Sequence, residues 1–531
     1  MFNANRGMID RAALISVSDT RGLEAFAKDL LNFGFKLYAT ESTRRRLVEA
    51  GLEIRDVSEI TGFKSMLGGR VKTLHPLIYA GILASRSNPS HMEEIKKINA
   101  PLFDMIVVNP YPLPDESMKI EDFVERIDIG GITLLRAAAK NFTDVTVVCD
   151  PDDYDKILGE LSSKGDVSSE TRTLLAVKAM KMVAKYEQEI SRLLSKLLLG
   201  RELLYLSYEK SENLKYGENW HQSAQLYVSQ DSQGLNLAGA RRPFSRPMSF
   251  NNFLDAEAAI WVVVDLMEYG FSSVVVKHRS ICAAATGPTP LESLKIAWGS
   301  DPVSAYGSVL GFSYDVDKEV ARFLSKRFVE VVVAPSFSKD ALEILEDNRN
   351  VRLIEVGDLR KTVQKDYRFI SGGLLVQDRD MGYTEASEFR LVTKNVFPKD
   401  KLELARFACL AVKHVISNAV VVAREYAKGY YHTIGIGGGQ PNRVDAIVKL
   451  AIPRALEYCR RNGLKPEEVL RECVLASEAF FPFPDSIEAI ADAGLKYVVQ
   501  PGGSKRDTEV IEAADKRGVA MLFTGRRCFK H

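Results

Sequence analysis

The sequence is poor in cysteine, has no long apolar run and carries no excess of either charge. Its six cysteines are scattered over 531 residues and form no CxxC pair, which excludes a disulfide framework and a paired-thiol zinc site. The most apolar stretches are interrupted by Asp or Lys well before the ~18 residues that a membrane span needs. The first ten residues contain no run typical of a signal peptide. We therefore expect a cytoplasmic protein with reduced thiols, no metal and no membrane partner.

The charge balance and the length narrow the possibilities further. Lys and Arg number 71 against 70 Asp and Glu, so the net charge at pH 7 is +1. A protein that binds a nucleic acid backbone by bulk charge is strongly basic, so nucleic acid is not an expected partner, and any anion must be bound by a local group of residues. At ~150 residues per domain, the length predicts more than one domain.

Strand-like and helix-like segments alternate over the first 150 residues. Apolar runs typical of buried strands lie at 12–18, 35–39, 104–109 and 144–149. Amphipathic, helix-like segments lie between them at 23–33, 43–50, 120–126 and 133–141. This order predicts a parallel sheet covered by helices. Ligands bind beyond the carboxyl ends of such strands, so the loops after Ser18, Ala39 and Asn109 are candidate binding segments.

The pattern changes after a long helical segment at 169–199. Eight further strand-like runs follow, mostly separated by helical segments, at 273–277, 309–312, 330–334, 352–356, 419–423, 474–477, 497–500 and 520–523. They predict either one large α/β unit or two similar ones, although no clear sequence repeat is visible.

One window of the first part has no acidic residue. Residues 61–92 contain no Asp or Glu, and within them Arg70 and Lys72 follow two glycines and precede Thr73. Residues two apart in an extended segment point to the same side, and guanidinium, ammonium and hydroxyl groups together suit an anion. The same spacing also fits a solvated basic loop.

Four more polar motifs lie next to predicted helices or strands. Ser16-Val17-Ser18-Asp19 and residues 40–43 precede helices, where hydroxyls and free N–H groups suit a phosphate, although plain helix capping explains them equally. Asp128, followed by two glycines and later by Lys140, suits acid–base chemistry or a capped helix. Lys277-His278 ends an apolar strand and is either a proton-transfer pair or a surface pair.

Several common cofactor motifs are missing. The glycine run at 435–439 ends in Gln440 instead of the last glycine of a dinucleotide loop, and no βαβ unit with an acidic residue about 20 residues further on is evident. The sequence also contains no Walker A loop, no HExxH and no GxSxG motif. NAD and nucleotide triphosphates are therefore not predicted.

Taken together and in order, these motifs resemble the family of bifunctional purine biosynthesis enzymes over almost the whole chain. The first part matches the inosine monophosphate (IMP) cyclohydrolase half at 16–19, 68–76, 128–131 and 140–141. The second part matches the half that formylates 5-aminoimidazole-4-carboxamide ribonucleotide (AICAR), at 215–219, 221–222, 251–252, 255–256, 277–278, 301–305, 417–419, 479–483 and 500–504.

The resemblance implies a fold and two domains. It implies an α/β protein in which 1–200 form a methylglyoxal-synthase-like parallel α/β domain with cyclohydrolase activity. Residues 201–531 would form a formyltransferase made of two cytidine-deaminase-like α/β units. The family pattern further implies a homodimer with formyltransferase sites shared across the interface.

The resemblance also implies two successive reactions. AICAR first takes a formyl group from 10-formyltetrahydrofolate, or from another formyl-pterin, and the resulting formyl-AICAR then closes its ring with loss of water to give IMP. No tightly bound cofactor is implied. For formyl transfer, it implies His278 as base, Lys277 as proton donor or electrostatic partner, and Asn418 as a residue that holds the formyl oxygen or orients the amine. The implied ligands in this half are Lys215, Tyr216, Asn252, Arg527 and, on the folate side, Asp485.

For ring closure, the resemblance implies that Lys72, Tyr111, Asp128 and Lys140 line the reacting end. The residues that it implies around the phosphate are Ser16, Ser18, Thr40, Ser42, Thr43, Arg70 and Thr73.

Some positions depart from the family pattern. Thr20 stands where the family has Lys, with Arg21 as a candidate substitute, and Glu41-Ser42-Thr43 stands where the family's phosphate loop has Gly-Gly-Thr. In the second part the departures are Lys215 for Arg, Trp220 for Pro, Arg279-Ser280-Ile281 after His278, and Pro484 for Arg. They leave two alternatives to the bifunctional enzyme: a cyclohydrolase with a degenerate or altered-donor formyltransferase half, and a non-enzymatic nucleotide sensor.

Overall fold

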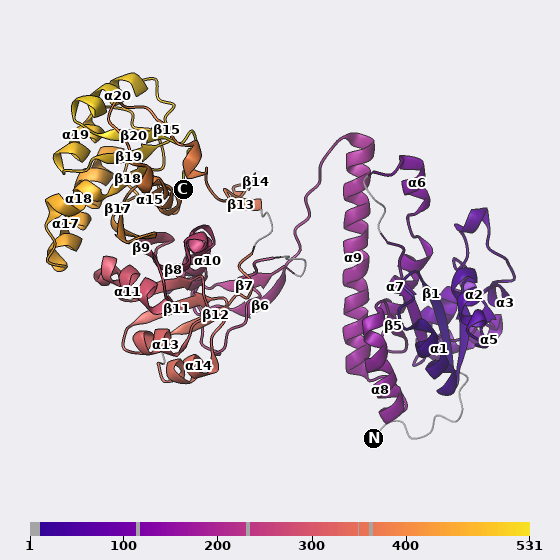
Figure 1. Ribbon diagram of the computed structural model, residues 1–531. Helices are drawn as coiled ribbons and strands as arrows, with labels where there is room; N and C mark the ends of the chain where they lie inside the picture. Colours follow the sequence, from indigo (N-terminus) through magenta and orange to yellow (C-terminus); the bar gives the residue numbers. More distant parts are fainter. Residues whose placement is uncertain (1–10, 113–116, 230–233, 349, 361–364) are drawn as a thin grey trace. The chain divides into compact units, whose positions relative to one another are not determined.

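The structure, a computed structural model, describes residues 11–112, 117–229, 234–348, 350–360 and 365–531. The chain divides into two compact units, Met1–Leu206 and Ser207–His531, which Figure 1 colours from indigo to magenta and from magenta through orange to yellow. Within the described ranges, no helix combines the length and the hydropathy of a membrane span.

The first unit is built on a parallel sheet with the strand order β3-β2-β1-β4-β5. Leu14 of the central strand pairs in register with Tyr38 on one side and Ile106 on the other. Ala12 and the next three residues are almost completely buried, as expected for a parallel strand with helices on both faces. The predicted parallel sheet is confirmed. Its strands are β1 (Arg11–Val17), β2 (Phe35–Ala39), β3 (Arg55–Asp56), β4 (Met105–Asn109) and β5 (Thr146–Val148).

Helices connect and cover these strands, and the longest of them is α9. It begins after Ser168, whose side chain accepts a hydrogen bond from the N–H of Thr171, and ends at Gly200 in the left-handed conformation. Its buried residues recur every three or four positions from Leu175 to Leu193, which places one face against α7 and β5. The helices are α1 (Leu23–Asn32), α2 (Glu41–Glu49), α3 (Ser58–Thr61), α4 (Pro76–Leu83), α5 (Pro89–Ile98), α6 (Ile120–Glu125), α7 (Gly130–Lys140), α8 (Tyr154–Lys164) and α9 (Ser169–Leu199).

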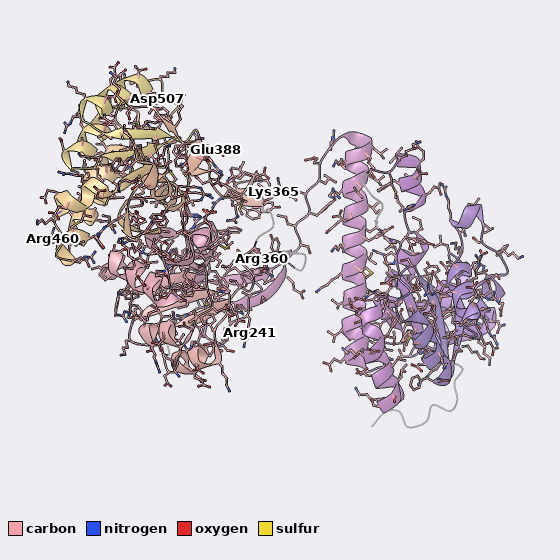
Figure 2. The ribbon with its side chains drawn as sticks, in the orientation of Figure 1. Arg241, Arg360, Lys365, Glu388, Arg460 and Asp507 are labelled. Atoms are coloured by element: carbon pink, nitrogen blue, oxygen red, sulfur yellow. The ribbon has the colours of Figure 1, made fainter. Side chains whose placement is uncertain are left out.

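The second unit contains a mixed sheet of eleven strands with the order β12-β11-β10-β8-β9-β17-β16-β18-β19-β20-β15. Figure 2 labels Arg241, which pairs with Glu355 of β12, and Asp507 at the start of α20, near opposite ends of this sheet. Its strands are β8 (Phe271–Lys277), β9 (Ser280–Gly287), β10 (Ser308–Phe312), β11 (Val329–Ala334), β12 (Arg352–Glu355), β15 (Arg390–Leu391), β16 (Val420–Ala427), β17 (Tyr430–Gly437), β18 (Val474–Ser477), β19 (Tyr497–Gln500) and β20 (Ala520–Phe523).

Two halves of this sheet follow the same path. In each, an antiparallel hairpin (β8-β9 or β16-β17) is followed by a strand antiparallel to the hairpin's first strand, and then by two parallel strands. The halves join where β9 pairs with β17, with His432 opposite Ala285. The two alternatives left open by the sequence are therefore both realised, because one large sheet is made of two similar halves.

Alternate residues of the central strands face different cores. Val274 and Val276 pack in the core that contains α10 and α15, whereas Val275 faces the core that contains α11 and α13. This period of two lets a fully apolar strand be covered on both faces. The helices are α10 (Phe250–Leu266), α11 (Pro290–Ser300), α12 (Pro302–Ala305), α13 (Lys318–Ser325), α14 (Lys339–Glu346), α15 (Leu402–Val412), α16 (Arg443–Asp445), α17 (Ile452–Arg461), α18 (Pro466–Glu472), α19 (Asp485–Asp492) and α20 (Asp507–Lys516).

The strand directions gather several loops at one edge of the large sheet. The pairing places the carboxyl ends of β8, β17, β18, β19 and β20 at the same edge as the amino ends of β9 and β16. Two small hairpins, β6 (Glu209–Asn213) with β7 (Gln225–Val228) and β13 (Lys365–Ile370) with β14 (Gly373–Asp378), form separate two-stranded sheets.

Candidate active sites

A cavity of about 710 Å³ lies at the carboxyl ends of β1, β2 and β4 in the first unit. It gathers residues from five separate segments of the chain. The predicted site residues that line it are Ser16, Ser18, Thr40, Ser42, Arg70, Lys72, Thr73, Tyr111 and Asp128. The cavity therefore lies beyond the carboxyl ends of parallel strands, where α/β proteins bind their ligands.

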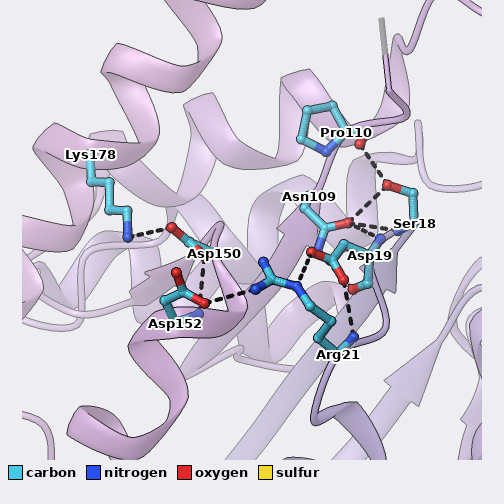
Figure 3. A network of polar contacts seen from close by, with 8 residues as sticks. All are labelled: Ser18, Asp19, Arg21, Asn109, Pro110, Asp150, Asp152 and Lys178. Carbon is cyan, nitrogen blue, oxygen red and sulfur yellow. Dashed lines mark hydrogen bonds and ion pairs between the residues drawn. The ribbon is translucent and has the colours of Figure 1, made fainter. Parts of the chain in front are cut away.

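Asn109 shapes one wall of this cavity. Its Oδ1 accepts hydrogen bonds from the backbone N–H groups of Ser18 (2.7 Å) and Asp19 (2.8 Å) and from the Ser18 hydroxyl (3.0 Å), as Figure 3 shows. The Ser18 hydroxyl also lies 2.7 Å from the carbonyl oxygen of Pro110. One amide therefore ties the loop after β1 to the end of β4. In the sequence, Asn109 precedes a candidate binding loop, but no motif signals its role.

The two departures near the phosphate loop point away from the cavity. The Arg21 guanidinium donates to Asp19 (2.8 Å) and to Asp152 (3.0 Å) in Figure 3, and Arg21 does not line the cavity. Glu41 is exposed, pairs with Arg45 one turn along α2, and is likewise not a lining residue. The Glu41 carboxylate therefore does not approach the cavity wall that carries the serine and threonine hydroxyls.

Asp128 sits over the start of α7 in a partly buried position. Gly131 N–H donates to its Oδ1 at 2.7 Å, and a Cβ on Gly131 would lie 2.5 Å from its Oδ2. Burial raises the pKa of Asp128, while hydrogen bonds from the backbone N–H groups of Gly131 and Tyr111 and the charge of Lys72 oppose that shift. A carboxyl whose pKa is raised is a better proton acceptor than an ordinary one.

Two charged residues that sequence analysis missed also line this cavity. Glu125 forms an ion pair with Arg70, in which the Arg70 Nε lies 3.1 Å from Oε2, and Arg126 follows it directly. Both lie at the end of the predicted helix at 120–126, three and two residues before Asp128, and nothing but their proximity to that residue signalled a role.

Two predicted residues lie outside the cavity lining. Thr43 is buried behind it, with its Oγ1 3.2 Å from the N–H of Val17. Lys140 is exposed at the last position of α7, whose first residues line the cavity. Ten residues of helix at ~1.5 Å each separate Lys140 from that end, so its role in ring closure stays a prediction.

In the second unit, the predicted formyltransferase residues lie along the loop-rich edge of the large sheet. Lys277 ends β8, and His278 and Arg279 form the turn into β9. The Lys277 ammonium donates to the carbonyl oxygen of Tyr306 at 2.7 Å, and the His278 side chain is exposed. Of the departures after His278, Arg279 belongs to the turn and Ile281 is buried in the core of α10 and α15.

The predicted nucleotide ligands Lys215, Tyr216 and Asn252 lie at the start of α10, the helix whose Asp255 binds the His278 turn. Lys215 N–H donates to the carbonyl oxygen of Met248, and Phe250 N–H donates to that of Tyr216, so this segment packs on the start of α10. There Asn252 is buried: its Oδ1 accepts from Ser249 N–H and its Nδ2 donates to Glu330 at 3.0 Å. The Asn252 side chain is thus already engaged in capping α10.

Asn418 precedes β16 at the same edge and is held by three partners. Its Nδ2 donates to the carbonyl oxygens of Gln440 (2.9 Å) and Pro441 (3.1 Å), and its Oδ1 accepts from Arg443 at 2.7 Å. Arg443 also forms a buried ion pair with Glu478 at 2.7 Å. An amide group has two N–H donors, so both are used here, and Oδ1 retains one free lone pair.

The remaining predicted residues flank the same edge. Asp485 is exposed at the first position of α19, directly after Pro484, and its Oδ1 accepts from Ser486 N–H at 2.6 Å. Arg527 follows β20, is exposed, and stacks on Phe529 at 4.4 Å. The sheet topology places the loops that carry Asp485 and Arg527 at the same edge as the His278 turn.

Comparison with known proteins decides the family. The AICARFT/IMPCHase bienzyme model matches residues 138–454, and the MGS-like domain model matches residues 22–133. The bifunctional purine biosynthesis protein PurH of Persephonella marina is 42% identical over 98% of this chain and 100% of its own. The chain belongs to the bifunctional PurH family.

Other PurH proteins are similar over the same extent. That of Rhodopirellula baltica is 42% identical over 98% of this chain and 99% of its own, and that of Bacillus cytotoxicus is 40% identical over 98% and 100%. Among solved structures, ForH shares 38% identity over 35% of this chain and 99% of its own, with a TM-score of 0.33. By the family-model match and the strand pairing, the first unit has an MGS-like parallel sheet and the second has a large mixed sheet.

Proposed function

We propose that this PurH chain catalyses both family reactions: formylation of AICAR to formyl-AICAR, followed by dehydrative ring closure to IMP. One observation carries the proposal. Each unit gathers, at one edge of its sheet, the residue types that its reaction requires: Asp128, Lys72 and Tyr111 in the first, and His278, Lys277 and Asn418 in the second. A chain that had lost either activity would not need to keep the corresponding group of residues together.

In the first unit, we assign the phosphate of the nucleotide to the wall formed by Ser16, Thr40 and Ser42. The start of α2 supplies free N–H groups there, and Arg70 with Lys72 supplies positive charge. The formyl carbon and the carboxamide nitrogen are then held in one molecule, so orientation supplies much of the acceleration.

Ring closure needs proton transfers at the reacting end. The carboxamide nitrogen attacks the formyl carbon and loses one proton, the formamido nitrogen loses its proton, and the former formyl oxygen takes up two protons and leaves as water. Asp128 suits the acceptor of the amide proton because its pKa is raised by burial. The ammonium of Lys72 suits stabilisation of the charge that develops on the formyl oxygen, with the Tyr111 hydroxyl beside it.

In the second unit, the weakly nucleophilic AICAR amine attacks the formyl carbon of 10-formyltetrahydrofolate. His278, exposed at its turn, takes the amine proton, and Lys277 supplies the proton or the charge that the departing folate N10 requires. Because both Asn418 N–H donors are used by backbone carbonyls, its free Oδ1 lone pair suits an amine N–H better than a formyl oxygen. Of its two expected roles, we therefore favour orientation of the amine.

The proposal also includes the division of the second unit into two similar halves and the formation of a homodimer. The two halves of the large sheet share one strand path, which supports a pair of cytidine-deaminase-like units. The β13-β14 hairpin exposes Phe369 (80%) and Leu375 (57%), and an isolated hairpin is marginal in water, which supports a homodimer that covers it. Sedimentation equilibrium of the full chain tests this; a monomer at all concentrations would refute the dimer.

The test of function follows IMP formation from AICAR and 10-formyltetrahydrofolate with the purified full chain. We expect IMP from the wild type, and a loss of about 10²–10⁴-fold in His278→Ala, with ring closure of supplied formyl-AICAR unchanged. Lys516→Met, an exposed substitution in the same unit, is the matched control. If IMP forms only from supplied formyl-AICAR, the formyltransferase half is degenerate or uses another donor, and assays with other formyl-pterins distinguish these two cases. If neither AICAR nor formyl-AICAR is converted, the result favours a nucleotide sensor.

A further inference from the structure

The turn that carries His278 has an unusual backbone. His278 and Arg279, the two residues between β8 and β9, both have positive φ (54° and 64°). This is the pattern of a type I′ hairpin turn, for which Asn and Gly are preferred. A non-glycine residue in that region is strained and persists only where its surroundings hold it. The neighbouring structure must therefore stabilise this turn.

One stabilising contact comes from α10. The Asp255 carboxylate accepts the backbone N–H of Arg279 at 2.6 Å and also that of His278. Asp255 binds only the backbone N–H groups of the turn, so the backbone carbonyl groups need another partner.

That partner is the second-last residue of the chain. The Lys530 ammonium donates to the carbonyl oxygen of Arg279 at 2.7 Å and to that of His414 at 3.2 Å. Its own carbonyl oxygen accepts the N–H of Ser417 at 3.0 Å, next to Asn418. Lys530 thus binds the His278 turn through its side chain and the Asn418 segment through its backbone.

We propose that Lys530 is a positioning residue for formyl transfer, which fixes His278 and Asn418 relative to one another. This inference rests on the roles proposed above for those two residues. Lys530 itself need not touch the substrate, because it acts on two backbone segments whose side chains do. Loss of its ammonium would free the turn on its carbonyl side and lengthen the average distance between base and amine.

The charges around Lys530 favour loss of its proton. Burial lowers the pKa of Lys530 to about 8, and nearby cations add to the effect, whereas one carboxylate opposes it. The groups that face it are Arg279 on the turn, Asp255 on α10, Arg368 on β13, Arg379 after β14 and His414 after α15. The pKa of His414 is itself lowered to about 4 by burial, so His414 is neutral at pH 7. A neutral amine donates weaker hydrogen bonds than an ammonium.

The test compares Lys530→Met and Lys530→Arg with the wild type, using steady-state formyl transfer. Misplacement of a catalytic group by about 1 Å can cost up to roughly 100-fold, so we expect Lys530→Met to lower kcat by about tenfold or more, with KM for AICAR within about threefold. Lys530→Arg, whose guanidinium stays charged, should restore most of kcat. It should also retain activity near pH 9, where the wild type declines.

Two further measurements keep the result interpretable. Ring closure of formyl-AICAR in the first unit reports that each variant is intact, and Lys516→Met controls for loss of a lysine elsewhere in the second unit. The proposal fails if kcat of Lys530→Met stays within about twofold of the wild type, or if its KM rises while kcat is unchanged. It also fails if Lys530→Met and Lys530→Arg lose activity equally. Failure of the proposed function looks different, because the wild type itself would then make no formyl-AICAR.

Discussion

Asp128 shows how one buried side chain links stability to catalysis. It lies over the N–H groups that begin α7, and burial still raises its pKa above the ordinary value of an aspartate. An ionised group whose pKa is raised on folding destabilises the folded protein at pH values above that pKa. The charge that suits Asp128 to accept a proton therefore opposes folding at neutral pH.

Replacing this carboxyl should separate the two effects. We expect Asp128→Asn to lower the ring-closure rate by about 10²–10⁴-fold and to raise the Tm at pH 7, because the amide is not charged and Oδ1 still accepts from Gly131. The stability gain should disappear as the pH falls below the raised pKa, where the wild-type carboxyl is also neutral. Measurement of Tm and of formyl-AICAR turnover against pH checks both; a variant less stable than wild type at pH 7 would contradict the argument.

At the scale of elements, packing explains the glycine run that resembles a dinucleotide loop. Gly435 and Gly437 lie within β17, facing the helical segment Ala446–Ala451. A Cβ at Gly437 would lie 2.0 Å from the carbonyl oxygen of Ala446, and one at Gly435 would lie 2.2 Å from that of Ala451. These glycines let a helix approach a strand closely, which agrees with the rejection of a dinucleotide site.

Substitution of one of these glycines should therefore be costly. We expect Gly437→Ala to destabilise the second unit by roughly 1–3 kcal/mol or more, because the clash is with backbone atoms that cannot rotate away. Gly299→Ala, in α11 with open space around it, is the matched control and should be neutral or stabilising by up to ~1 kcal/mol. Urea unfolding followed by circular dichroism measures both, and equal midpoints for the two variants would contradict the packing explanation.

At the scale of the whole molecule, the chain joins two units that each have their own core. The residues between Gly200 and Tyr208 have no regular secondary structure and are exposed. Exposed irregular segments between cores are preferred sites of proteolysis. In the proposed function, the cyclohydrolase reaction uses only residues of the first unit, so this activity should survive separation from the second unit.

Limited proteolysis tests this division. We expect the earliest cleavage between residues 200 and 208, and a first fragment that still closes the ring of formyl-AICAR at a rate within about threefold of the full chain. Mass spectrometry of the fragments and turnover of each purified piece are the measurements. First cleavage inside either core, or a first fragment without activity, would show that the units depend on one another.

The sequence alone predicted that the first sheet is parallel, and it predicted the long helix α9 and nine of the residues that line the first cavity. It could do so because alternation of apolar runs and helical segments is a local signal, and because short motifs lie directly after predicted strands. The same reasoning placed Lys277-His278 at a strand end. It could not join the two halves of the second unit, because strand pairing such as β9 with β17 depends on residues that are far apart along the chain.

Tertiary structure decided which polar groups are free to act. It turned Arg21 and Glu41 away from the cavity, engaged Asn252 in a helix cap, left Thr43 and Lys140 outside the lining, and added Asn109, Glu125 and Arg126. It also brought Lys530 from the end of the chain to the His278 turn. A motif specifies which chemical groups are present, but hydrogen-bond partners contributed by distant segments determine each group's orientation, charge and remaining capacity to bind a substrate.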